Sequence, residues 1–514
     1  MNSKTILRNT VWYGLENLIS FLASLITSVV VARTLGPSRM GYIIYVMWVA
    51  NIVSSFGSIG IPATTRKYMA EYLGAGDQST ARFIYFKTLW LQIAMASVVT
   101  LLAIVWVLLD APAEFRVAAF LLVIGVWPSM VNFISAQANV ASENLSANLP
   151  ASAASTVTFF VMTLLAVFLH WGVVGIASAM LGMRVSDFAV RFVPTVLKIR
   201  KWPSQNVTVP VDLRPRMLQF AWQSVTSMLL TLIVWDRSEI FLLKHLSSDI
   251  RQVAFYSVAF SLAEKLLIFP TVFASATGAT VFAQYGRDRS KIPGMIAASV
   301  RYLGLTSLPL HIVTTALSGS LLIAMYGDQY KGAILVATMA PLTCLPKAFL
   351  TPVQTLFEAV ERQKYFIWAT LAASVVDVGV AWWLIPRHGA VGATIGSGLA
   401  QAMAVSALWT FGIAQYRIRL PWAFLAKVVI GSSLAAVCAF AVARLLAPLP
   451  GLLVGAATAF TILLGFAWLF RVFEREDLER LKVLVDVSPS FLAAPVRMTY
   501  SLLLSRVSIA DELL

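Results

Sequence analysis

Gly172-Val173-Val174-Gly175-Ile176-Ala177 decides the fold, because Gly389-Ala390-Val391-Gly392-Ala393-Thr394 repeats its pattern in the second half of the chain. Each element separates two long apolar runs. Matches elsewhere keep a similar register of roughly 215 residues, as duplicated membrane units do. The matching pairs are Ala153-Ala154-Ser155 with Ala372-Ala373-Ser374, Ala70-Glu71-Tyr72 with Ala283-Gln284-Tyr285, and Leu35 and Tyr45 with Leu246 and Tyr256. The sequence therefore predicts a duplicated membrane unit, which is how many transporters are built.

The composition excludes a soluble protein. Hydrophobic residues make up 59% of the chain and charged residues 12%, with a mean hydropathy of +0.80. Soluble domains are far more polar. The net charge of +15 is scattered over short connections, which favours attraction to anionic lipid over nucleic-acid binding. Cys344 and Cys438 lie in apolar runs and have no disulfide or metal-ligand spacing.

Apolar runs of about 20 residues predict an all-α polytopic membrane protein with about fourteen transmembrane helices. Twelve of them form two parallel six-helix lobes, and two extra helices follow at the C-terminal end. The expected helices lie near 11–32, 42–61, 83–109, 117–139, 149–169, 173–196, 217–243, 253–283, 302–325, 333–357, 365–385, 391–414, 423–446 and 451–472.

The distribution of basic residues predicts the orientation. Segments on the side of the N-terminus carry roughly three times as many Lys and Arg residues as segments on the other side. Both termini are therefore expected in the cytoplasm. The expected parts are an N-terminal lobe (1–197), a cytoplasmic linker (198–216), a C-terminal lobe (217–416), two additional helices (417–472) and a cytoplasmic tail (473–514).

Charged residues inside expected helices are candidates for function, because burying a charge in a membrane is costly. Arg184, Asp187 and Arg191 share one face of the sixth helix. One interpretation is an internal ion pair between Asp187 and Arg191. The other is a cationic stripe that binds an anionic substrate, with Arg184 as its deepest member and Asp187 tuning it.

The seventh expected helix carries Asp236, Arg237 and Glu239 within an otherwise apolar run. Three charges in four residues predict a break in the helix. Asp236 or Glu239 would then couple transport to a proton or cation, with a lobe-to-lobe salt-bridge network as the alternative.

Isolated charges complete the candidates. Lys347 lies in a helix interrupted by three prolines, which predicts a bending or gating element. Glu16 and Asp377 are ion-coupling candidates or simple partners of basic neighbours. We assign substrate binding to Arg184, Arg191, Arg237, Lys265 and Lys347, and ion coupling to Asp236, Glu239, Asp187, Glu16 and Asp377.

No HExxH-like metal motif, Ser-His-Asp constellation or P-loop is present in the sequence. We therefore expect a transporter and not an enzyme. Its energy would come from an ion gradient, the membrane potential or the gradient of the substrate. No cofactor is expected beyond a coupling proton or sodium ion.

Over roughly residues 1–420, the chain resembles the polysaccharide (Wzx-type) flippases of the multidrug/oligosaccharidyl-lipid/polysaccharide exporter (MOP) superfamily. The resemblance rests on Asn9 to Gly14, on Val31-Ala32-Arg33-Thr34-Leu35-Gly36-Pro37 followed by Gly41-Tyr42, and on Gly60-Ile61 leading to Tyr68-Met69-Ala70-Glu71-Tyr72. It implies alternating access and transport of an undecaprenyl-diphosphate-linked oligosaccharide for lipopolysaccharide or exopolysaccharide synthesis. It also implies the bacterial inner membrane as location, and polymerase and chain-length proteins as partners.

Three alternatives stay open. An ion-coupled drug or cation antiporter of the same superfamily would want an acidic cavity, whereas basic residues slightly outnumber acidic ones inside the expected helices. A lipid II flippase has a similar architecture but a different opening motif. A membrane-embedded polysaccharide polymerase or ligase needs a long catalytic loop, and the expected outer loops are short.

Overall fold

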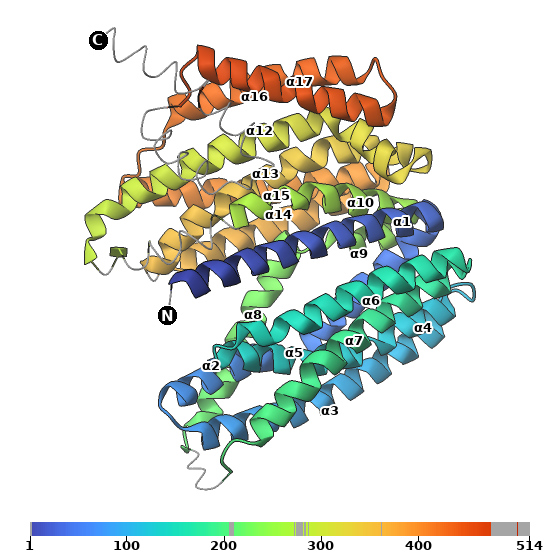
Figure 1. Ribbon diagram of the computed structural model, residues 1–514, viewed down its shortest axis with the longest axis vertical. Helices are drawn as coiled ribbons and strands as arrows, with labels where there is room; N and C mark the ends of the chain where they lie inside the picture. The colour runs from blue at the N-terminus through green and yellow to red at the C-terminus, as the bar shows by residue number, and fades with distance from the viewer. Residues whose placement is uncertain are drawn as a thin grey trace. The chain divides into compact units, whose positions relative to one another are not determined.

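The computed structural model describes residues 3–204, 210–271, 273, 281, 284–285, 287–360, 362–473 and 501. Within these ranges the side chains of 3–22, 145 and 226–233 are not described. The described residues form helices and connections without any strand, which confirms the all-α prediction (Figure 1). Apart from residues 473 and 501, the expected cytoplasmic tail lies outside the described residues.

The chain divides into two compact units. The first comprises 1–232 with 248–254, and the second comprises 233–247 with 255–514. The helices of the first are α1 (Ser3–Gly57), α2 (Ile61–Gly74), α3 (Gln78–Asp110), α4 (Arg116–Ile124), α5 (Val126–Ala141), α6 (Leu149–Phe168), α7 (Gly172–Arg200) and most of α8 (Leu213–Trp235). Those of the second are α9 (Glu239–Leu246), most of α10 (Arg251–Lys265), α12 (Ile292–Tyr326), α13 (Ile334–Ala359), α14 (Lys364–His388), α15 (Ala390–Tyr416), α16 (Trp422–Ala443) and α17 (Pro448–Leu469).

Eleven helices among the described residues are long and apolar enough to cross a membrane. They cover twelve of the fourteen expected helices, because the first two expected helices are joined across a kink at Gly36 and together form α1. Only Gly36, with φ of 71°, departs from helical geometry there, and Pro37 follows it. The seventh and eighth expected helices correspond to α8 with α9 and to α10. The chain is a multi-pass membrane protein.

The first glycine of each twin element has the same backbone feature in both units. Gly172, with φ of 56°, is the first residue of α7. Gly389, with φ of 53°, directly precedes α15. Side chains with a Cβ rarely adopt this conformation, so glycine allows the tight turn between two helices. The repeat seen in the sequence therefore marks equivalent helix–helix turns.

The second glycine of each element permits close packing. A Cβ at Gly175 would lie 2.7 Å from the Ala166 Cβ on α6, and one at Gly392 would lie 2.6 Å from the Leu384 backbone carbon on α14. Helices α6 and α7 pack along each other, as do α14 and α15 (Figure 1). Small residues at such contacts bring helix backbones together inside membranes, where packing drives association.

The two C-terminal helices belong to the second unit. Helix α16 packs against α12 and α17, and α17 also contacts α12 (Figure 1). Ala435, Ala439 and Ala443 of α16 are buried against Leu317 of α12 and Ala459 of α17. The pair α16–α17 is therefore an integral layer of this unit.

We expect Gly392→Ala to destabilise the second unit by about 1–3 kcal/mol, because its Cβ would overlap backbone that cannot move independently. Thermal unfolding in mild detergent measures the effect. Gly379→Ala on α14 is the control, since nothing lies within 4 Å of a Cβ at that position. Equal unfolding temperatures for the two variants would contradict the packing role of Gly392.

Candidate functional site

The helix break expected at Asp236–Glu239 is present in the second unit. Helix α8 ends at Trp235, Arg237 has φ of 56°, and α9 begins at Glu239. A break leaves the last carbonyls of α8 without partners from their own helix, and inside a membrane no water replaces them. The break therefore needs donors from other helices.

Two side chains supply these donors. The Lys347 Nζ on α13 donates to the Trp235 carbonyl oxygen at 3.1 Å. The Gln401 Nε2 on α15 donates to the Val234 carbonyl oxygen at 3.5 Å. Lys347, predicted to bind substrate, is thus engaged with the end of α8 in this structure.

Arg237 forms a two-pronged ion pair with Glu264 of α10. Its Nε donates to Glu264 Oε1 at 3.1 Å, and its Nη2 contacts Oε2. Lys265 follows Glu264 at the end of α10, while Asp236 is exposed. The positive charge of Arg237 is balanced by Glu264. Both residues belong to the second unit, so this ion pair is not the lobe-to-lobe network expected as the alternative.

Glu239 and Asp377 form a pair of buried carboxylates in the second unit. Each side chain is only 1% exposed, and they face each other from α9 and α14. Tyr256 of α10 and Ser397 of α15 lie beside Glu239, which places groups from four helices at one point. We name this cluster the acidic pair.

Among the described residues, no donor meets the oxygens of either carboxylate of the acidic pair at hydrogen-bonding distance and angle. Two adjacent carboxylates in a buried site cannot both carry a negative charge without a counter-charge. A shared proton or a monovalent cation would supply that counter-charge. The geometry thus fits ion coupling at two residues, Glu239 and Asp377, that the sequence marks as candidates.

The first unit contains a different arrangement along α7. Arg191 and Asp187 form an ion pair at 2.7 Å, and the Asn132 Nδ2 on α5 donates to the second Asp187 oxygen at 2.7 Å. The internal ion pair expected as one interpretation is therefore present, and the charges of Asp187 and Arg191 balance each other.

Arg184, near the middle of α7, has neutral partners. Its guanidinium donates to the Leu122 carbonyl oxygen at 3.3 Å and to Asn51 Oδ1 at 3.4 Å. The described residues place no carboxylate within 4.0 Å of it. Gly125 gives it room, because a Cβ there would lie 2.8 Å from the Arg184 Cδ. Arg184 is thus a half-buried cation in the first unit with no described acidic partner.

The remaining candidate, Glu16, belongs to α1, and its side chain lies outside the described residues. Sequence reasoning missed the neutral members of both sites. They are Asn51 and Asn132 in the first unit, and Tyr256, Ser397 and Gln401 in the second. Polar amides within apolar runs, such as Asn132 and Gln401, are the signal that would have identified some of them.

Comparison with known proteins bears on this arrangement. Residues 6–283, more than half of the chain, match the sequence model of a family described as polysaccharide biosynthesis protein. No curated protein sequence shows a significant match.

Solved structures share the fold at low sequence identity. The lipid II flippase MurJ in an inward closed conformation aligns with a TM-score of 0.70 and 14% identity, over 90% of this chain and 98% of its own. An inward-facing multidrug resistance MATE transporter of the MOP superfamily aligns with a TM-score of 0.66 and 16% identity, over 77% of this chain and 94% of its own. A MOP superfamily transporter from Pyrococcus furiosus, described as having a binding pocket of reverse polarity, aligns with a TM-score of 0.51 and 15% identity, over 77% and 98%. The fold is that of MOP-superfamily transporters.

We expect Lys347→Met to destabilise the second unit by about 1–3 kcal/mol, because the Trp235 carbonyl would lose its donor in a membrane-buried position. Unfolding in mild detergent measures the loss. Lys427→Met is the matched control, since this exposed amine lies 3.5 Å from the Phe470 carbonyl oxygen at a helix end. A loss no larger than that of the control would show that Lys347 does not support the break.

Proposed function

The chain belongs to the polysaccharide biosynthesis protein family, and from this membership we propose that it is a flippase for lipid-linked oligosaccharides. The transported molecule is an undecaprenyl-diphosphate-linked oligosaccharide destined for a surface polysaccharide. Transport proceeds by alternating access without ATP hydrolysis. We place the protein in the bacterial inner membrane with both termini in the cytoplasm, next to polymerase and chain-length proteins.

The structural observation that carries this proposal is that Arg184 has only neutral hydrogen-bond partners among the described residues. A half-buried guanidinium without a described acidic partner is unfavourable in a membrane protein unless an anion or water compensates it. The planar guanidinium offers several N–H donors and matches phosphate oxygens in a two-pronged geometry. A diphosphate is the anionic part of the proposed substrate. Arg184 therefore supports recognition of the linkage that all such substrates share, whatever sugar is attached.

The acidic pair supports ion coupling as the source of energy. A pair of buried carboxylates needs a proton or a sodium ion as counter-charge. The fraction of transporters that hold this ion would then follow the ion concentration on the side of the membrane to which the pair opens. A ligand shifts a conformational equilibrium only through a difference in affinity between two states. We propose that binding and release of this ion, at Glu239 and Asp377, biases the transporter between its two states.

The acidic pair is also compatible with an alternative function, that of a drug or cation antiporter. A drug or cation antiporter would use the same two carboxylates to bind a cationic compound in exchange for an ion. Arg184 in the first unit opposes a cationic load, and the family match favours polysaccharide synthesis. A lipid II flippase carries the same diphosphate linkage, so it differs from our proposal only in the glycan.

Arg184→Ala should abolish export of the surface polysaccharide in a strain that lacks the native gene, because the diphosphate would lose its main counter-charge. Lipid-linked oligosaccharide would accumulate in the inner leaflet, which radiolabelled precursor analysis measures. Gly125→Ala should reduce export by about tenfold through displacement of Arg184, equivalent to about 1.4 kcal/mol. Arg116→Ala, an exposed arginine at the start of α4, is the control, and normal export by Arg184→Ala would contradict the proposal.

Glu239→Gln and Asp377→Asn should each remove the dependence of transport on an imposed proton or sodium gradient. The neutral amides no longer need a counter-charge, so binding of the ion would be lost. Transport by purified protein in lipid vesicles, with each gradient imposed separately, measures this dependence. Glu114→Gln, at an exposed carboxylate near Arg39, is the control. Retained gradient dependence in both variants would rule out coupling at the acidic pair while leaving the substrate proposal intact.

A further inference from the structure

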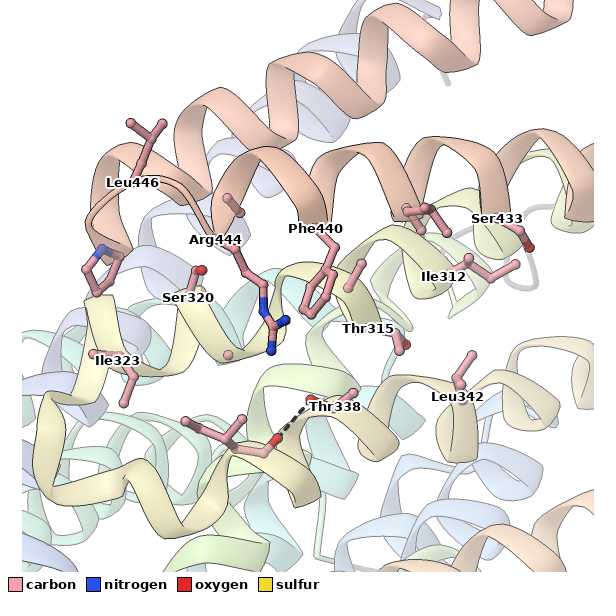
Figure 2. Close-up of a pocket in the computed structure, with 17 residues that line it drawn as sticks. Ile312, Thr315, Ser320, Ile323, Thr338, Leu342, Ser433, Phe440, Arg444 and Leu446 are labelled. Atoms are coloured by element: carbon pink, nitrogen blue, oxygen red, sulfur yellow. Dashed lines mark hydrogen bonds between the residues drawn. The ribbon is translucent and has the colours of Figure 1, made fainter.

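A groove of about 790 Å³ lies between α12, α13 and α16 in the second unit (Figure 2). Its size is in the range of cavities that enclose a small organic ligand. Leu342, Val437 and Phe440 line it and remain 46%, 67% and 43% exposed, so the groove is open at the side of the helix bundle. In a multi-pass membrane protein this opening faces lipid.

The lining is mostly apolar, although it includes the hydroxyl groups of Thr315, Ser320, Thr338 and Ser433. Thr315 donates its hydroxyl proton to the His311 carbonyl oxygen at 2.9 Å, and Thr338 donates to the Ile334 carbonyl oxygen at 2.9 Å (Figure 2). Both donors are thus used within their own helices. A hydrocarbon chain can lie against the apolar side chains of the groove without displacing these two hydrogen bonds.

Arg444 is the exception. It is the one charged side chain among the described residues that line the groove, and it extends from the end of α16 towards α12 and α13 (Figure 2). Its guanidinium stacks on the Phe440 ring at 4.6 Å from the centroid. No described carboxylate forms an ion pair with it. Arg444 therefore presents a positive charge at one end of an apolar groove.

The helix boundaries fix the depth of this charge. Helix α12 ends at Tyr326, α13 begins at Ile334, α16 ends at Ala443 and α17 begins at Pro448. Two membrane-spanning helices thus end near Arg444 and two begin there. The ends of membrane-spanning helices lie where the membrane meets water. Phosphate groups of the bilayer lie at this level, and the planar guanidinium of an arginine matches phosphate oxygens in a two-pronged geometry.

We propose that this groove binds one anionic phospholipid of the surrounding bilayer, with its phosphate on Arg444 and an acyl chain along α12, α13 and α16. The two features that a phospholipid requires, an apolar channel and a cation at the interface, occur together here. The bound lipid fills the space between the two C-terminal helices and the rest of the second unit. The site is separate from Arg184 and from the acidic pair.

Native mass spectrometry of the full-length protein in mild detergent, with added phosphatidylglycerol, tests the proposal. The wild-type protein should bind one phosphatidylglycerol at least tenfold more tightly than phosphatidylcholine. Arg444→Gln should remove this tenfold preference. Gly319→Leu should also weaken binding, because the new side chain would project into the groove while Arg444 stays in place. The stabilisation against heat that phosphatidylglycerol gives should be lost in both variants.

Arg387→Gln is the matched control. Arg387 lies in the last turn of α14 and stacks on Trp383 at 4.9 Å, as Arg444 stacks on Phe440, but it does not line the groove. This variant should keep the lipid preference of the wild type. Equal binding by Arg444→Gln and wild type, or no preference for the anionic lipid, would overturn the proposal. Competition by inorganic phosphate alone, or tighter binding of a polyisoprenyl phosphate, would also overturn it, because the occupant would then be a free anion or the transported lipid.

Discussion

Inside a membrane every backbone carbonyl needs a donor from the protein itself, and this requirement organises the second unit. Interrupting a helix after Trp235 would be unfavourable if its final carbonyls had no partners. Lys347 and Gln401 meet the requirement from two other helices. The break in turn lets Arg237 reach Glu264 and places Glu239 beside Asp377. The acidic pair thus depends on the hydrogen bonds that make the break tolerable.

Much of the helical framework could be predicted from the sequence because each helix is a long apolar run bounded by glycine, proline or charge. Helix α14, for example, spans 364–388 where the apolar pattern predicted 365–385. The first two expected helices are both present in α1, where they are joined across a kink at Gly36. The partners of the charges could not be predicted. Nothing in the pattern shows that Lys347 meets a carbonyl 112 residues away or that Glu264 meets Arg237.

The two units share a repeated helix framework but differ in their chemistry. Helix α7 carries Arg184, Asp187 and Arg191, whereas α15, which starts at the equivalent glycine turn, contributes the neutral Ser397 and Gln401. The first unit thus has an arginine with neutral partners, and the second has a pair of carboxylates. Because packing of small residues builds both units, charges could diverge between them without disturbing the helix contacts. This division is consistent with substrate binding in one unit and ion coupling in the other.

The partners of the break also constrain the order in which the protein is made. The donor from α13 lies 112 residues after the carbonyl that it caps, and the donor from α15 lies 167 residues after its own acceptor. Synthesis runs from the N-terminus, so the segment around Arg237 leaves the ribosome long before Lys347 and Gln401 exist. Until then its open carbonyls and charges must stay in contact with water or with the insertion machinery. The broken segment can therefore acquire its hydrogen-bond donors only after α13 and α15 have been synthesised.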